Sequence, residues 1–388
     1  MRVLSFKLAL MMFITSFSIQ AQKHKVYVKN FETDKNTTAI FNLENTTIAI
    51  ETSFDGNVYF DYHIEFENYS KKEISKLLEA INIEAVKFED NITLKATSIT
   101  KSQTSYSIDT KNGITLDSDF LGNKNDKKEV FRKSRDSIIT EIKDYHKTSI
   151  KKFFNFFKTL DDSGNKKDIR RGDVKIIRSQ FIIKMPPFVK LTINAKDSQI
   201  IFNDDITNEL HLVLKNGSFK AKMLANPFNN LKVENATFLA ENISGGNYTL
   251  NNVSNGLIGS LEKVKIVSEF SKIEIGEIAK ETIITDFNSK YWFYNFSTDF
   301  KRFDVFSEYS KLKMFYPKLD FSFSAFGNNT IHYVDGNIIT MQPSRKGEKF
   351  KMMEQKMKGN ELFSGHINFD IIHGIIYTAT DSLKTINK

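Results

Sequence analysis

Residues with side chains able to bind a metal or transfer a proton occur throughout this 388-residue chain, but not at the spacing of a known site. No pair of histidines stands in an HExxH motif or a comparable metal-ligand arrangement. His366 and His373 are nearest to each other, and because they flank a predicted strand we expect them at its solvated edges. We therefore predict no metal site among the histidines, which are His24, His63, His146, His211, His332, His366 and His373.

Motifs for nucleophilic catalysis and nucleotide binding are also missing. The sequence has no GxSxG, Walker or GxGxxG motif. It has no cysteine, which excludes a thiol nucleophile, disulfides and thiolate metal sites. Paired acids and an integrin-type tripeptide fall in predicted turns, where Asp hydrogen-bonds to nearby backbone; they are Asp161-Asp162, Asp204-Asp205 and Arg171-Gly172-Asp173. We predict no catalytic residue, no cofactor and no enzymatic activity.

The elements that would position a binding residue come from a pattern that recurs about every nineteen residues. Around Ser198, apolar residues stand seven and five positions before it and two and four after it, namely Leu191, Ile193, Ile200 and Phe202. Side chains alternate along a strand, so residues two apart share one face. Each repeat is therefore predicted to be a strand, a polar corner and a second strand. The central positions are Ser198, Gly217, Ala236, Asn255, Ser271, Ser289 and Ser310.

A single repeat of this length cannot bury its own apolar face, so neighbouring repeats must stack. In a parallel β-solenoid each repeat is one coil, and equivalent strands pair in parallel. In a β-sandwich, successive repeats would be antiparallel hairpins. The constant offsets favour the solenoid, because like positions then stack on like, and the corners lack the Asn-Gly pairs of tight hairpins. We predict an all-β solenoid and keep the sandwich as the alternative.

The same template extends outward along the chain. It fits around Gly374, around Thr46 and again after Gly56, which predicts one coil near the C-terminus and two between residues 39 and 66. The Lys- and Met-rich segment 342–360 is predicted to loop out of the stack. Aromatic side chains are expected to stack inside the coils, and the candidates are Phe202, Phe293, Phe303, Phe306, Phe315 and Tyr316.

The N-terminus has the order of a secretory signal peptide. Arg2 and Lys7 precede the apolar run 8–17, and Ser18-Ile19-Gln20-Ala21 follows, so cleavage is predicted after Ala21. The apolar run is too short for a membrane anchor, and without cysteine the chain cannot be a lipoprotein. We expect export to the periplasm or the cell surface. The mature chain is divided into an N-terminal β region (22–125), a basic helical insertion with its connector (126–178) and solenoid repeats (179–388).

Two segments depart from the strand pattern. Residues 70–81 carry apolar side chains at helical spacing and are predicted as a short helix. From Asp126 to Leu160 a second and longer amphipathic helix is predicted, which caps the solenoid or lies along it. Its apolar positions are Phe131, Ile138, Ile142, Tyr145, Phe153, Phe156 and Leu160.

The positive charge of the chain is concentrated in one segment. Between Lys124 and Arg178 there are 17 Lys and Arg against 9 Asp and Glu, a net of +8 that equals the formal net charge of the whole chain. One interpretation is a patch for anionic partners, including a membrane surface contacted by the 126–160 helix. The other is a solvated helix face and a basic connector. Nucleic acid is not expected as a partner of an exported protein.

One segment resembles a known family. Phe181-Ile182-Ile183-Lys184-Met185-Pro186, then Val189-Lys190-Leu191-Thr192-Ile193 and the serial repeats up to Tyr333, look like the putative adhesins with β-strand repeats. In that family of exported bacterial envelope proteins, a strand–Pro–strand segment leads into a right-handed β-solenoid. The composition is also similar to that of secreted Bacteroidetes proteins. The resemblance supplies no catalytic or ligand-binding residue.

The function expected from these observations is that of an exported cell-envelope protein with an adhesin-like binding or scaffolding role. Its partner would be an envelope protein, a glycan or an anionic surface. The alternative is a β-helix that binds or cleaves polysaccharide, since such enzymes place Lys, Arg and acidic residues along an outer groove.

Overall fold

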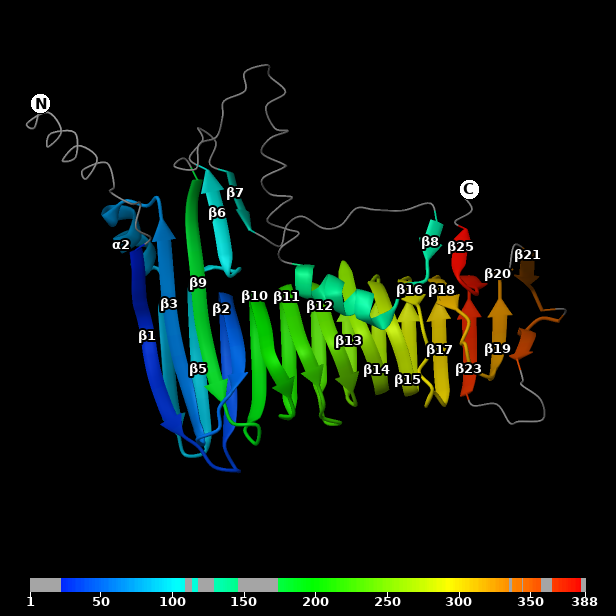
Figure 1. Ribbon diagram of the computed structural model, residues 1–388, viewed down its shortest axis with the longest axis horizontal. Coiled ribbons are helices and arrows are strands. Elements are labelled where there is room, and N and C mark those ends of the chain that lie inside the picture. Colours follow the sequence, from blue (N-terminus) through cyan, green and yellow to red (C-terminus); the bar gives the residue numbers. More distant parts are fainter. Residues whose placement is uncertain are drawn as a thin grey trace, which may run out of the picture.

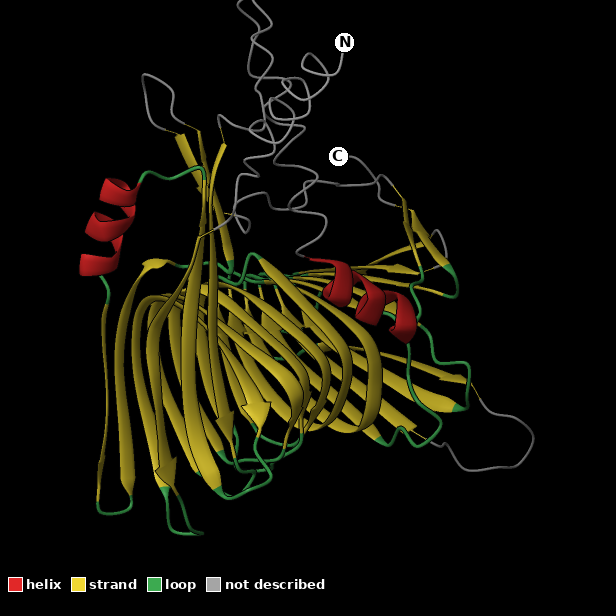
Figure 2. Ribbon diagram, turned by 60° about the vertical axis from the view of Figure 1, so that its left-hand side comes forward, coloured by secondary structure: helices red, strands yellow, loops and turns green. Residues whose placement is uncertain are grey.

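The computed structural model of the chain describes residues 22–108, 114–117, 129–145, 174–334, 337–343, 345–356 and 365–384. The predicted signal peptide, residues 1–21, lies outside the described residues. Strands stand side by side in one long row (Figure 1). The long strands bend along their length, so that the row has two facing layers (Figure 2). The predicted all-β class is confirmed. No helix in the described part of the chain is long and apolar enough to cross a membrane.

The N-terminal half contains β1 (Gln22–Glu32), β2 (Thr38–Thr52), β3 (Asn57–Glu67), α2 (Lys71–Glu79), β4 (Asn82–Phe88), β5 (Asn91–Thr100), β6 (Thr104–Ile108), β7 (Ile114–Asp117), β8 (Glu129–Phe131), β9 (Val174–Met185) and β10 (Lys190–Ile206). The C-terminal half contains β11 (Leu210–Leu224), β12 (Asn230–Ser244), β13 (Asn247–Asn251), β14 (Asn255–Glu269), β15 (Lys272–Phe287), β16 (Lys290–Phe293), β17 (Arg302–Glu308), β18 (Lys311–Phe315), β19 (Phe321–Asn328), β20 (Thr330–Val334), β21 (Asn337–Met341), β22 (Phe350–Lys356), β23 (Gly365–Ile372), β24 (Ile375–Ala379) and β25 (Ser382–Lys384).

The strands form two hydrogen-bonded ladders that are joined by a corner in every repeat. Ladder A holds the strand before each corner, in the order β5, β2, β10, β11, β12, β13, β14, β15, β17, β23 and β19. Ladder B holds the strand after it, in the order β9, β2, β10, β11, β12, β14, β15, β16, β18, β24 and β20. Long strands span both ladders: β10 contributes its first half to ladder A and its second half to ladder B, whereas β14 and β15 contribute their halves in the reverse order.

Pairing between successive repeats is parallel and in step. Ile193 of β10 lies opposite Leu212 of β11, and Leu212 lies opposite Leu231 of β12, so like positions stack at nineteen-residue intervals. Every pairing among β10 to β18 is parallel. For these strands the antiparallel hairpins of the sandwich alternative are therefore wrong, and the predicted parallel stacking is confirmed.

The core lies between the two ladders. The template residues Leu191, Ile193, Ile200 and Phe202 are all at most 2% exposed, and they belong to one apolar cluster that runs the length of the stack. Aromatic rings stack along this core, with the Phe219 and Phe238 rings 5.2 Å apart and nearly parallel. Of the predicted rings, Phe202, Phe293, Phe303 and Tyr316 lie in this cluster, whereas Phe315 packs against Tyr294 in a separate apolar cluster outside ladder B. Phe306 departs from the prediction, because it follows the inward Val305 and alternation turns its side chain outward.

Small hydroxyl residues occur at the corners because their side chains accept backbone hydrogen bonds there. A corner interrupts the ladder, and its backbone N–H groups then need another acceptor. The Ser271 N–H donates to Ser289 Oγ (2.9 Å), and the Ser289 N–H donates to Ser310 Oγ (3.1 Å). At Gly217 no side chain fits, since a Cβ there would meet the Ser198 carbonyl oxygen at 1.9 Å.

One predicted corner is wrong by two residues. Asn255 is not a corner but the first residue of β14, and it lies directly opposite Thr237 of β12. The corner residue of this repeat is Val253, whose N–H donates to Ser271 Oγ (3.0 Å). One extra residue, Ser254, widens this corner and shifts the strand that follows.

The ends of the row do not follow chain order. β2 pairs in parallel with β10, so the repeat predicted around Thr46 joins the stack. The second repeat predicted between residues 39 and 66 is wrong, because β3 pairs antiparallel with β1 and β9. At the other end, the predicted repeat around Gly374 lies between β17–β18 and β19–β20 and separates them. The segment 342–360 is not wholly a loop, because β22 pairs antiparallel with β19.

The second predicted helix begins later than expected, and the first lies within its predicted range. α2 is fixed by a capping box between Ser70 and Glu73, and it buries Ile74. The segment 126–178 is not one helix and a connector: residues 129–131 form a strand against β25, a helix covers 135–145, and β9 begins at Val174. Phe131 is exposed on its strand. The apolar positions Phe153, Phe156 and Leu160 lie outside the described residues.

Candidate binding surface

The outward side of ladder B, called face B, is covered between β12 and β24. The 135–145 helix lies across it and buries Ile138 and Ile142 against Leu239, Leu257 and Tyr294, in an apolar cluster separate from the main core. β8 and β25 lie beside this cluster, and Val130 and Leu383 pack against it (Figure 1). Face B thus serves as a second, smaller core.

Close approach of the helix to the sheet backbone and ion pairs between the two both hold the helix on face B. Gly259 leaves room for it, because a Cβ there would lie 2.8 Å from Ile139 Cγ1 and 2.2 Å from the Glu241 carbonyl oxygen. Lys133 just before the helix binds Glu274 (2.6 Å), and Lys143 binds Glu241 (3.4 Å). In the described part of the helix, basic side chains therefore meet acids of the sheet, and its apolar side is buried. Contact of the 126–160 segment with a membrane surface stays a prediction.

The outward side of ladder A, called face A, carries no covering element among the described residues between β10 and β17. It contains two shallow depressions. The first, about 430 Å³, lies over β5, β2, β10 and β11 and is lined by polar ladders. There the Asn194 amide donates to Asn42 Oδ1 (3.1 Å), and Lys196 lies 3.8 Å from Glu44. These side chains pair with each other along the stack.

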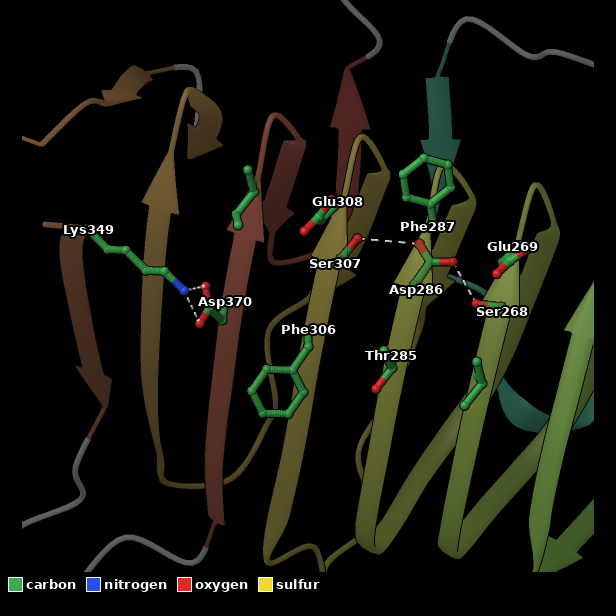
Figure 3. A pocket seen from close by; sticks show the side chains of 12 residues that line it. Ser268, Glu269, Thr285, Asp286, Phe287, Phe306, Ser307, Glu308, Lys349 and Asp370 are labelled. Atoms are coloured by element: carbon green, nitrogen blue, oxygen red, sulfur yellow. Dashed lines mark hydrogen bonds and ion pairs between the residues drawn. The ribbon is translucent and has the colours of Figure 1, made fainter. Parts of the chain in front are cut away.

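The second depression, about 330 Å³, lies over β14, β15, β17 and β23 (Figure 3). Parallel register builds it from two outward columns. One column runs Val267, Thr285, Phe306 and Asp370; the other runs Glu269, Phe287, Glu308 and Ile372. Apolar rings and carboxylates therefore alternate across neighbouring strands.

Two exposed phenylalanines distinguish this depression from the first. The side chain of Phe306 is 47% exposed and that of Phe287 is 39% exposed. Large aromatic side chains exposed together on a sheet face are uncommon in proteins that have no partner there. Burying them against a ligand would stabilise a complex by about 25 cal/mol for each Å² of apolar surface removed from water.

The charge of the second depression is negative. Lys349 neutralises Asp370, with its Nζ 2.6 Å from Oδ1. Glu269 and Glu308 are exposed, and no cationic side chain in the described part of the chain pairs with either. Two uncompensated carboxylates thus flank Phe287 on a chain whose net charge is +8.

A buried polar network supports this depression from inside. Ser268, Asp286 and Ser307 occupy the inward column between the two outward ones. Asp286 is 5% exposed and accepts from Ser268 Oγ (2.6 Å), Ser310 Oγ (2.5 Å) and Ser307 Oγ (3.3 Å). Three hydroxyl donors satisfy its carboxylate, as a buried acid requires.

Tyr291 completes the network. Its hydroxyl lies 2.7 Å from Ser268 Oγ. Burial raises the pKa of Tyr291 well above its usual value, and the charge of Asp286 raises it further. The phenol therefore stays protonated and donates to Ser268. This network links four strands and fixes the backbone beneath Phe287 and Phe306.

The histidines of the described ranges do not converge on one site. His332 is fully buried and bonds Thr378 Oγ1 (2.8 Å), His211 bonds Glu209 (3.1 Å), and His373 stacks on Tyr309. His146 lies outside the described residues. In the described ranges no group of three or more His, Cys, Asp or Glu is placed to hold a metal ion.

The paired acids singled out in the sequence are also apart from the depression. Asp204 accepts the Thr52 N–H (2.8 Å), and Asp205 binds Lys222 (3.1 Å). Asp161-Asp162 and Arg171-Gly172-Asp173 lie outside the described residues. The sequence analysis does not single out Glu269, Phe287 and Glu308 as binding residues, although the alternation of the template places them outward.

Comparison with known proteins gives no family assignment. No family model matches the sequence, and no curated protein matches it. Among solved structures, a putative cell adhesion protein from Clostridium sporogenes has 10% identity and a TM-score of 0.18, covering 92% of this chain and 99% of its own. A putative adhesin from Bacteroides fragilis has 8% identity and a TM-score of 0.32, covering 93% and 99%. With TM-scores this low, neither likeness supports an argument about function.

Proposed function

We propose that the chain is an exported cell-envelope protein with an adhesin-like binding role, and that the second depression of face A is its binding surface. The observation that carries the proposal is the pairing of exposed Phe287 and Phe306 with the uncompensated carboxylates of Glu269 and Glu308. The same repeats bury their opposite outward side under a helix, so the open side is the one left for a partner.

The proposed architecture behind this surface is a right-handed parallel β-solenoid. Parallel, in-step pairing supports it, because each repeat then repeats the outward position of the one before. A ligand that extends along the stack would meet an outward side chain at an equivalent position at each step of about 4.8 Å. Such periodic surfaces suit binding and scaffolding better than a single deep catalytic cavity.

The polysaccharide-cleaving alternative would need cations and carboxylates that converge on one groove. On face A two of the three lysines that line the first depression lie near acids, with Lys196 3.8 Å from Glu44 and Lys215 3.8 Å from Glu234. In the second depression Lys349 is bound to Asp370. We therefore propose binding without catalysis.

Fractionation and envelope retention test the proposal together. The full chain is produced in a Gram-negative host, and the first residue of the recovered protein is determined; Gln22 in the periplasmic or surface fraction is expected. Purified mature chain is then incubated with isolated envelopes. Phe306→Ser with Glu269→Gln and Glu308→Gln should lower retention at least tenfold.

Phe228→Ser is the matched control, because Phe228 is 70% exposed in the turn between β11 and β12, away from this depression. It should leave retention unchanged. Equal retention of the triple variant and the parent would contradict the assignment of the surface, and cytoplasmic recovery with residues 1–21 intact would contradict export.

A further inference from the structure

The corners between the ladders contain a conformational exception. The residue before each corner residue has a left-handed backbone, with φ between 50° and 56°. Asn and Asp tolerate that conformation better than other non-glycine residues, whereas bulky residues rarely adopt it. Most repeats follow this preference, with Asn45, Asp197, Asn216, Asn235, Asn252, Asn288 and Asn329 at the position.

Two repeats, separated by the repeat that contains Asn288, break the preference with large aromatic residues. Phe270 has φ 50° and Tyr309 has φ 56°, and their side chains are 55% and 53% exposed. Their rings are not needed to fill the core, and Asn at the same place would be less strained. Sparsely populated backbone conformations that persist outside the core are typical of ligand-contacting sites.

These side chains form a continuous stripe along the rim of the second depression. The Phe270 and Phe287 ring centroids are 5.6 Å apart, those of Phe287 and Tyr309 are 5.7 Å apart, and Tyr309 stacks on His373 at 4.9 Å. We call Phe270, Phe287, Tyr309 and His373 the aromatic stripe. It crosses four repeats in the direction of the stack.

Carboxylates stand beside the stripe at a regular interval. Glu269 and Glu308 each directly precede a stripe residue, and both are in the same outward column, with Phe287 on the strand between them. Strands two apart are about 10 Å apart. Because neither carboxylate has a described cationic partner, the stripe presents aromatic faces and negative charge together.

We infer that the aromatic stripe binds an extended cationic polypeptide segment, in which Lys or Arg side chains lie over the rings and pair with Glu269 and Glu308. The inference rests on the proposed function and names the ligand class of that surface. Aromatic faces attract cations, and Arg also stacks on rings while it pairs with a carboxylate. A polyproline-type segment repeats every three residues over about 9 Å, which matches the spacing of the two glutamates.

The test uses the mature full chain and defined peptides. A twelve-residue peptide with Arg at every third position and Pro elsewhere is compared by fluorescence anisotropy with the same peptide carrying Glu in place of Arg. The Arg peptide should bind at least tenfold tighter. Glu269→Gln with Glu308→Gln should remove that difference.

Phe270→Asn with Tyr309→Asn separates binding from structure. Asn suits the left-handed backbone, so the thermal midpoint should equal or exceed that of the parent while peptide affinity falls at least tenfold. Phe228→Asn, an exposed aromatic outside the stripe, should change neither quantity. A lower thermal midpoint with unchanged peptide affinity would assign the stripe a purely structural role and overturn the inference.

Two further outcomes distinguish this inference from the proposed function. If soluble glycans bind, the Arg peptide does not, and Phe270→Asn with Tyr309→Asn abolishes glycan binding, then the ligand class is wrong and the surface stands. If the Arg peptide binds no tighter than the Glu peptide and the triple variant of face A retains envelopes like the parent, then both proposals fail.

Discussion

Face A and face B belong to the same repeats, yet one is open and the other is covered. On face B, Gly259 and Gly276 remove side chains where the 135–145 helix approaches, and acids such as Glu274 meet its cations. On face A, Phe287 and Phe306 protrude and Glu269 and Glu308 remain uncompensated. Identical backbone pairing thus leaves the outward positions free to become either a second core or a binding surface.

The inside of the stack should tolerate far less change than either outward face. Ile266→Asp buries a charge at a side chain that is 1% exposed, and it should lower the free energy of unfolding by about 3–5 kcal/mol. Lys265→Asp, its outward neighbour on face A, should cost less than about 1 kcal/mol. Urea denaturation measures both, and equal losses would contradict the assignment of inward and outward positions.

Acid should weaken the inside of ladder B through His332. Burial lowers the pKa of His332 to about 4, below the ordinary value of 6.5. Between those pH values the unfolded chain binds the additional proton, so the free energy of unfolding decreases as the pH falls, by about 3 kcal/mol in all. Stability measured from pH 7 to 4.5 should fall less steeply in His332→Leu than in the parent. Parallel pH profiles would refute this role.

Face B should be sensitive to added volume. Gly259→Val places atoms against the Glu241 carbonyl and Ile139, and it should destabilise the fold by about 2–3 kcal/mol and loosen the helix. Thr285→Val also introduces Val, but on face A and with little change in side-chain volume. We expect it to change the free energy of unfolding by no more than about 0.5 kcal/mol. Thermal unfolding compares them, with hydrogen exchange of residues 135–145 as the local readout. Unchanged exchange would separate Gly259 from helix docking.

Face A should give the smallest effect on stability. Phe306→Ser removes a half-exposed ring that contacts solvent on one side, so the free energy of unfolding should change by less than about 1 kcal/mol. A loss of several kcal/mol would show that the exposed ring supports the stack, and the contrast between the two faces would be lost.

The sequence predicted the repeats because strand alternation and stacking act through near neighbours. Leu191, Ile193, Ile200 and Phe202 share one inward side, and that local rule holds through the stack. The order at the C-terminal end was not predictable in this way. β23 and β24 enter between repeats that are adjacent in sequence, and such an order depends on long-range pairing energies that a local template does not contain.

The candidate surface was partly accessible from the sequence. Alternation from Phe303 and Val305 places Phe306 outward, whereas the aromatic pattern alone predicts it in the inner stack. Strand alternation does not predict that Glu269 lacks a cationic partner, nor that face B is covered. Both depend on where the distant 135–145 helix docks and on which cations reach each strand.

Thiol labelling tests most directly whether face A is the surface that binds. The native chain has no cysteine, so Phe306→Cys and Phe228→Cys each introduce a single reactive group at an exposed position. Both should react rapidly with a maleimide in the free mature chain. Once the chain is retained on envelopes, the account predicts that Phe306→Cys becomes protected while Phe228→Cys stays reactive. Equal reactivity of the two thiols in the retained protein would contradict it.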